Sequence, residues 1–186
     1  MVYELKNCLN GEKKEEFKTT VEILVVDEKY LTFKFDCKNS CFYSANDKYN
    51  TAIYNGDVCE AFICTGENIN EYYEIEVAPN NCQFLMKMTN YGTEFIDGKT
   101  KHNLKSEPIP ETENFLVSKV EKSGNDYKVE FSVPLDKIGY KKEIGIRLNA
   151  YRIETEGGET NKHLLALNPT MVHSFHMPNK FIKINF

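Results

Sequence analysis

Apolar and polar residues alternate with a period of two along most of the chain, and turn residues separate the alternating runs. Residues 21–25 and 31–35 alternate on either side of an Asp-Glu-Lys turn at 27–29, a pattern typical of a β-hairpin. Residues 127–133 alternate after a Ser-Gly-Asn-Asp turn. No stretch sustains a helical period. The pattern predicts an all-β fold, an antiparallel β-sandwich of jelly-roll-like type with about ten strands and little helix.

Two further stretches refine this picture. Residues 58–64 read VCEAFIC, apolar on both faces apart from Glu60, which is typical of a central strand. Cys59 and Cys64 would then point to opposite faces, so they can neither bond to each other nor share a metal ion. Residues 90–114 show little periodicity. We expect this stretch to be an irregular excursion from the sandwich that contains one short strand at 93–96. We also expect it to be the most mobile part of the chain.

Composition supports a folded core and excludes some function classes. With 186 residues, 41% of them hydrophobic, the chain is expected to form a single domain over residues 1–186. The net charge of -5 comes without a one-sided basic cluster, which argues against nucleic acid as a partner.

The chain shows no signal-peptide pattern and no run of 18 apolar residues, so we expect no membrane association. The chain is therefore expected in the cytoplasm, whereas a signal peptide removed during maturation would place it outside the cell. The six cysteines form no Cys-x-x-Cys pair, which favours reduced thiols.

Glu60 is the lone charge in its apolar strand, and a buried carboxylate is costly unless something pairs with it. One interpretation is structural: Glu60 caps a backbone amide or meets Arg147 or Arg152. The other is functional: it accepts hydrogen bonds from ligand hydroxyl groups. Asp57 lies three residues earlier and would face the other side of the sheet, so the two do not form a glycosidase acid and base pair.

The closing segment holds His173, Phe175 and His176 between two prolines, just before a final alternating strand at 182–186. The two histidines are three residues apart in a non-helical stretch. No third ligand of suitable spacing is evident, which argues against zinc. His176 is expected to tie neighbouring backbone together.

Four segments then suggest a family. In chain order they are YNGDVCEAFI, YYEIEVAPNN, IRLNAYRIE and HLLALNPTMVHSFHMPNKF. Their order and separation resemble the signature segments of the family 9-like carbohydrate-binding modules. The resemblance extends from about residue 18 to the end of the chain.

The resemblance implies a β-sandwich that binds a mono- or oligosaccharide without cleaving it, often as an accessory to a glycoside hydrolase, with structural calcium in some members. Two aromatic rings of the family clamp a sugar, and carried onto this chain they fall on Tyr54 and Phe175. Glu60 would hydrogen-bond sugar hydroxyl groups, Lys87 would stand in for the family's basic residue, and His176 would hold the loop beside the ring.

This chain departs from the family pattern because it has no Trp, and Ile182 replaces the usual Gly after the final Phe. Tyr and Phe offer less stacking surface than Trp, so weaker or altered binding is expected. One alternative concerns Phe175 alone, which would simply be part of the core. Two others concern function: the chain is a glycan-active enzyme, or a fragment of one, that uses Asp57 or Glu154, or the sandwich serves protein contacts.

Overall fold

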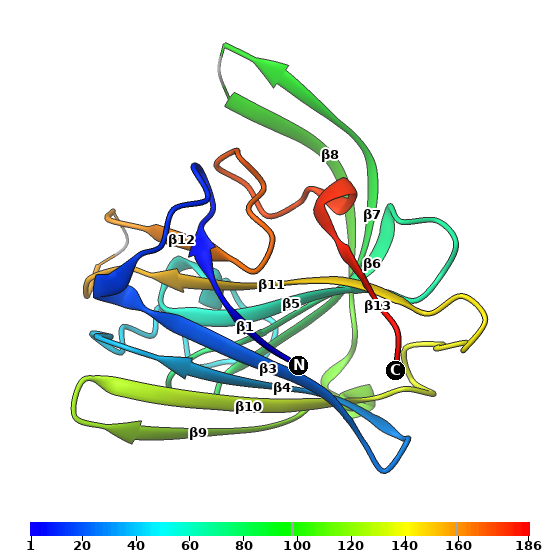
Figure 1. The fold of residues 1–186 in the computed structure, drawn as a ribbon, viewed down its shortest axis with the longest axis horizontal. Helices are drawn as coiled ribbons and strands as arrows, with labels where there is room; N and C mark the ends of the chain where they lie inside the picture. The colour runs from blue at the N-terminus through cyan, green and yellow to red at the C-terminus, as the bar shows by residue number, and fades with distance from the viewer. Residues whose placement is uncertain (98, 159) are drawn as a thin grey trace.

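The computed structural model describes residues 1–97, 99–158 and 160–186. Two antiparallel sheets pack face to face in it, and the described residues contain no α-helix, only single turns of 3₁₀ helix (Figure 1). The predicted all-β antiparallel sandwich is confirmed. The described residues form thirteen strands, more than the ten or so expected, because several have only two to four residues and leave little alternation to read.

The smaller sheet has five strands in the order β1-β3-β4-β10-β9. They are β1 (Val2–Glu4), β3 (Thr19–Val26), β4 (Tyr30–Cys37), β10 (Asp126–Pro134) and β9 (Val117–Ser123). The two expected hairpins, β3–β4 and β9–β10, are both present. Asp27 and Glu28 lie in the three-residue loop between the paired residues Val26 and Tyr30, and their φ angles of 52° and 56° give the left-handed geometry that lets a tight turn follow the twist of the strands.

The larger sheet has the order β2-β12-β11-β5-β6-β7-β8. Its strands are β2 (Lys6–Asn7), β12 (His163–Ala166), β11 (Ile146–Glu154), β5 (Val58–Cys64), β6 (Glu71–Val77), β7 (Gln83–Ile96) and β8 (Lys99–Pro108), and β13 (Ile182–Ile184) also pairs with β11. All seven residues of β5 are buried between β11 and β6, as predicted for a central strand.

Apolar side chains cover both faces of the larger sheet. One cluster fills the space between the sheets, and a second lies on the outer face beneath loops and the C-terminal segment. Cys59 belongs to the first cluster and Cys64 to the second, which confirms that they point to opposite faces. All six cysteines are free thiols.

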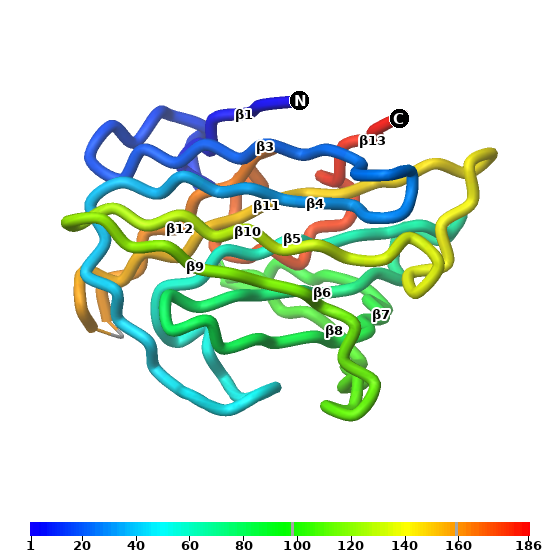
Figure 2. The backbone as a smooth tube through the Cα atoms, turned by 90° about the horizontal axis from the view of Figure 1, so that it is seen from below, coloured from blue at the N-terminus to red at the C-terminus, as the bar shows by residue number. Residues whose placement is uncertain are grey.

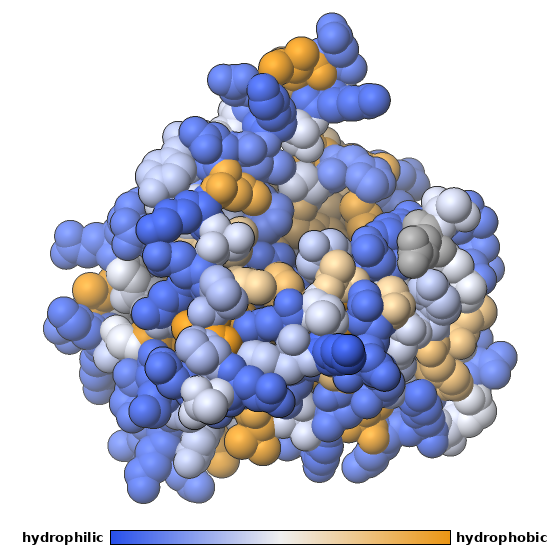
Figure 3. Space-filling model, turned by 180° about the vertical axis from the view of Figure 1, so that it is seen from behind, coloured by the Kyte–Doolittle hydropathy of each residue, from blue (hydrophilic) through white to orange (hydrophobic). Residues whose placement is uncertain are grey.

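Strands β7 and β8 continue past the sandwich as a projecting ribbon, called the arm below (Figure 1). The excursion expected at residues 90–114 was therefore wrong, because most of that stretch is regular antiparallel strand. Phe95 and Ile96, near the tip, are exposed. Figure 3 shows this apolar surface surrounded by hydrophilic atoms. Residues 94–97 near the tip are all exposed, so this part of the arm imposes no burial pattern on its sequence.

The two termini lie near each other, beside β1 and β13 (Figures 1 and 2). Seen from below in Figure 2, the strands of the smaller sheet lie over those of the larger one. Among the described residues, no helix has the length and apolar character needed to cross a membrane.

Candidate functional site

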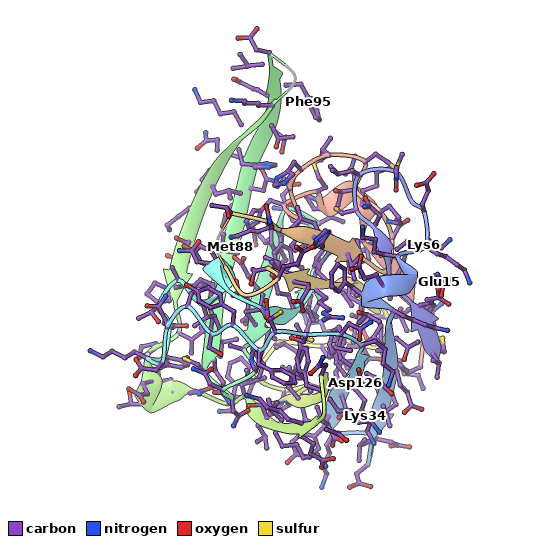
Figure 4. The ribbon with its side chains drawn as sticks, turned by 90° about the vertical axis from the view of Figure 1, so that its left-hand side faces the viewer. Lys6, Glu15, Lys34, Met88, Phe95 and Asp126 are labelled. Carbon is purple, nitrogen blue, oxygen red and sulfur yellow. The ribbon has the colours of Figure 1, made fainter. Side chains whose placement is uncertain are left out.

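A hollow of about 350 Å³ opens on the outer face of the larger sheet, between the base of the arm and the C-terminal loop. Side chains from β5, β6, β7, β8, β11 and β12 line it, together with Tyr54 and residues 173–176. Figure 4 places Met88, one of the lining residues, at the base of the arm. The hollow brings together chain segments that are more than 100 residues apart.

Three glutamates form the floor of this hollow. Glu60 of β5 pairs directly with Glu76 of β6, and Glu74 lies two residues away on the same face of β6. Each contributes a carboxyl oxygen, and these three oxygens lie within 4.8 Å of one another. Like charges so placed repel, and burial adds to that cost. The strand register thus concentrates acidic groups at one point.

Burial determines how these carboxyl groups titrate. It raises the pKa of Glu74 to about 8. Burial, followed by the charge of Glu74, raises the pKa of Glu60 well above its ordinary value, and burial with both neighbouring carboxyl groups does the same to the pKa of Glu76. Lys162, at the side of the hollow, acts in the opposite direction on Glu60 and Glu76. Without a bound cation the floor holds protons at neutral pH, so it can donate hydrogen bonds as well as accept them.

Tyr54 stands at the rim, in the 3₁₀ turn η2 (Ile53–Asn55) that leads into β5. It is 40% exposed, and its ring meets Phe84 edge to face with centroids 5.7 Å apart. Lys162 Nζ donates a hydrogen bond to the backbone oxygen of Tyr54 at 2.8 Å. The ring is therefore supported on one edge, and part of it is open to the hollow.

Phe175 also lines the hollow, but it is far more buried. Only 7% of it is exposed, and it stacks on Tyr151 with centroids 4.1 Å apart and an angle of 15° between the planes. The Tyr151 hydroxyl donates to the backbone oxygen of Phe175 at 3.1 Å. Because Tyr151 covers one ring face, Phe175 presents much less surface to a ligand than Tyr54 does.

His176 lies in the hollow, and both its ring and its backbone form hydrogen bonds that hold the loop. Its Nδ1 forms a hydrogen bond with the Tyr72 hydroxyl at 2.9 Å, and its backbone oxygen accepts one from Asn90 Nδ2 at 3.2 Å. Its ring packs on Phe62. Burial, with a contribution from His102, lowers the pKa of His176 to about 4, so it is neutral at pH 7.

Lys87 is not brought to this hollow. Lys87 shares a face of β7 with Leu85, and this face is opposite to the one that lines the hollow. Its Nζ lies 5.8 Å from the ring centroid of Tyr73, in a separate depression. The basic side chain that lines the hollow is Lys162. No sequence pattern singled it out, because it lies in a loop about 100 residues from Tyr54 and Glu60 along the chain.

Glu60 forms neither an ion pair nor a hydrogen bond with Arg152 in the described part of the chain. The guanidinium group of Arg152 pairs with Glu154 at 2.6 Å and donates to Thr19 Oγ1 at 2.9 Å. By contrast, Glu60 Oε1 has no hydrogen-bond partner in the described part of the chain. The arginine that could have neutralised Glu60 is thus engaged on the other face of the sheet.

Asp57 is a structural anchor. Its carboxylate accepts hydrogen bonds from Ser40 Oγ at 3.0 Å, from Tyr43 N at 2.9 Å and from Thr155 Oγ1 at 2.7 Å, and it is fully buried. Glu154 is likewise fully buried in its pair with Arg152. Neither carboxylate lines the hollow, which removes the geometric basis for an enzyme that uses them.

A family sequence model and a known protein each match nearly the whole chain. The sequence model of the carbohydrate family 9 binding domain-like family matches residues 2–185. An extracellular protein of Arthroderma benhamiae is 28% identical over 176 residues, which cover 91% of this chain and 79% of that protein.

Solved structures share the fold at low sequence identity. A candidate carbohydrate-binding protein from Bacteroides uniformis superposes with a TM-score of 0.70 at 11% identity, covering 97% of this chain and 84% of that one. A family 9 carbohydrate-binding module from Caldicellulosiruptor kristjanssonii in complex with glucose gives a TM-score of 0.63 at 13% identity, covering 98% and 83%. A module of the same family and organism in complex with cellotriose gives 0.60 at 11%, covering 98% and 82%. This chain belongs to the carbohydrate family 9 binding domain-like family.

Proposed function

We propose that the chain binds a mono- or oligosaccharide in this hollow and does not cleave it. The observation that carries the proposal is the joining of an exposed aromatic ring, Tyr54, with a floor of buried carboxyl groups in one cavity. Sugars present CH faces that pack on aromatic rings and hydroxyl groups that need polar partners. Family membership and this cavity together make carbohydrate the ligand that fits best.

The proposed roles follow from exposure. Tyr54 would stack on the sugar, and Phe175 would bound the other side of the cavity with its uncovered edge. Glu60, whose Oε1 lacks a partner in the described structure, would accept a hydrogen bond from a hydroxyl group. The volume of about 350 Å³ lies near the lower end of the roughly 300–1,000 Å³ typical of small-molecule sites, which suits a sugar ring better than a long chain.

The floor argues for binding without hydrolysis. A glycosidase places its two carboxyl groups on either side of the bond to be broken. Glu60, Glu74 and Glu76 instead project from adjacent strands on one face of the sheet, so a sugar would lie above all three. Incubation with chromogenic glycosides should release no product, and measurable turnover would favour a hydrolase.

Calorimetric titration of the whole chain tests the proposal. Glucose and cello-oligosaccharides come first, because similar structures hold glucose and cellotriose, and xylo- and manno-oligosaccharides follow. Tyr54→Ala should weaken binding by about tenfold or more. Tyr91→Ala is the matched control, since Tyr91 is 64% exposed on the arm and does not line the hollow. Silence across the panel would favour a protein-contact role.

An accessory role beside a glycoside hydrolase would follow from sugar binding. It would appear as faster hydrolysis of an insoluble glycan when the chain is fused to such an enzyme, with Tyr54→Ala abolishing the gain. An equal gain from the variant would count against it.

A further inference from the structure

The glutamate floor has a feature that sugar binding does not require. Glu60, Glu74 and Glu76 converge from two strands in the middle of the sheet, and their oxygens lie within 4.8 Å of one another. Glu60 is 2% exposed and Glu76 is fully buried. Central strands hold their side chains in well-defined directions, so the convergence is built into the fold.

Three of the six carboxyl oxygens on this floor are buried without a partner among the described residues. They are Glu60 Oε1 and both carboxyl oxygens of Glu76. Buried polar atoms are normally paired, and a buried carboxylate is the costliest exception. Lys162 supplies one positive charge at the side of the hollow, but its Nζ also donates to the Tyr54 backbone. One lysine does not balance three carboxylates.

We propose that this floor binds one hard divalent cation, coordinated directly by Glu60, Glu74 and Glu76. The three oxygens all lie within 4.8 Å of one another, so no two of them are farther apart than two Ca–O bonds of about 2.4 Å, and one ion can contact all three carboxyl groups. Carboxylate donors favour Ca²⁺, Mg²⁺ or Mn²⁺ over thiolate-seeking metals. The charges of a divalent cation and the Lys162 ammonium group together balance three carboxylates.

His176 lies at the edge of this group without belonging to it. Its Nε2 is 3.9 Å from Glu74 Oε1, while the Nδ1 bond with Tyr72 fixes the ring. An imidazole ligand would shift the preference toward zinc. The proposal assigns coordination to the carboxylates alone, so His176→Asn, whose amide can still hydrogen-bond the Tyr72 hydroxyl, should bind the cation as wild type does.

Shared protons are the rival way to neutralise the floor, because Glu74 and Glu76 lie close enough to share one. The two possibilities differ in a direct measurement. A cation site responds to added metal and binds one ion per chain, whereas a proton-held floor does neither.

The test uses the full chain stripped with a chelator, with CaCl₂, MgCl₂ and MnCl₂ added separately. At least one of these salts should raise the melting temperature, and calorimetry should show one ion per chain. Glu76→Gln and Glu60→Gln should each weaken that binding by about tenfold or more, since ligand charge sets affinity at such sites. Glu71→Gln, on the same strand but exposed, should bind as wild type does.

The proposal is overturned if none of the three salts binds, or if Glu76→Gln binds the cation as tightly as wild type. It does not rest on sugar binding, because the metal is measured without any sugar present. Sugar titrations of the stripped and the metal-loaded chain separate the two: binding of metal but no sugar would overturn only the proposed function.

Discussion

Glu60 of β5 and Glu76 of β6 face each other across adjacent strands, with both carboxyl groups buried on the outer face of the larger sheet. A directly opposed pair of acidic residues at the centre of a sheet opposes folding unless a proton, a cation or a ligand compensates. The fold therefore keeps a local arrangement that is unfavourable in itself. Such conflicts between local chemistry and global stability mark functional sites.

This pair predicts an unusual pH dependence of stability when a chelator excludes metal ions. Because the pKa values of Glu60, Glu74 and Glu76 are raised in the folded chain, the native state holds protons that the unfolded state has lost. Stability is then fully present below the unfolded carboxyl pKa and is lost as pH rises. The expected loss is up to about 1.4 kcal/mol per pH unit for each carboxyl group protonated only in the native state.

The measurement is denaturant unfolding from about pH 7 to about pH 8.5, a window above the titration of His176, whose pKa is lowered to about 4, and of unfolded His. Wild-type stability should fall across this window, with Glu76→Gln giving a shallower slope and the exposed Glu71→Gln an unchanged one. A flat or rising wild-type curve would contradict the assigned pKa directions.

Strand parity explains how much of this site could be predicted. Residues 58–64 were correctly predicted as the central strand β5. In β6, Glu74 and Glu76 alternate with Tyr73, Ile75 and Val77, so strand parity alone sets the two glutamates on one face. The register of β5 against β6 could not be predicted from the sequence. A shift of one residue would have moved Glu76 away from Glu60. From the sequence, Glu60 was therefore singled out, but neither Glu74 nor Glu76 was.

Strand parity also explains why Lys87 does not line the hollow. Its parity matches Leu85, a residue of the core between the sheets, whereas Phe84 and Met88 face the hollow. Sequence position suggested a basic residue near the site, but only the β6–β7 register shows which face of β7 is available to a ligand. Lys162 reaches the hollow through tertiary structure alone, for which no local signal exists.

The second prediction concerns Gly56, which lies between Tyr54 and β5. A Cβ atom there would lie 2.5 Å from the Tyr43 backbone oxygen and 2.7 Å from the Ala45 backbone nitrogen, so main chain must move to admit it. Gly56→Ala should reduce the free energy of unfolding by about 1–3 kcal/mol, as overpacking does. It should also weaken sugar binding by displacing Tyr54.

Gly66→Ala is the matched control for this substitution. Its added Cβ would meet nothing nearer than the Asn68 backbone nitrogen at 4.0 Å, so denaturant unfolding should give a value close to wild type. Equal destabilisation by the two variants would show that the close approach at Gly56 is not the cause.

The buried pair of Arg152 and Glu154 yields a third prediction, about stability alone. Arg152→Met removes the cation beside Glu154 and the donor to Thr19, leaving a buried carboxylate without its partner. The expected loss in the free energy of unfolding is about 3–5 kcal/mol. Adding Glu154→Gln should recover part of it, because the stranded charge is gone. Arg147→Met, on the same strand but only half-buried, should change stability much less.

Phe175 and Tyr54 supply the last prediction, since both line the hollow but differ in burial. Phe175 is 7% exposed and stacked on Tyr151, so Phe175→Ala should lower the free energy of unfolding by about 3–5 kcal/mol. Tyr54 is 40% exposed, and Tyr54→Ala should cost only about 1 kcal/mol while removing most of the sugar affinity.

Denaturant unfolding and calorimetric titration of the same preparations separate the two roles. Phe175→Leu keeps most of the buried volume, so it should retain the fold and allow the contribution of the ring to sugar binding to be measured directly. If Phe175 mainly supports Tyr151, this variant binds sugar nearly as well as wild type. A large loss of sugar affinity in Phe175→Leu at unchanged stability would instead show that Phe175 stacks on the sugar. A Tyr54→Ala variant as unstable as Phe175→Ala would contradict the assignment of a mainly structural role to Phe175 and a mainly binding role to Tyr54.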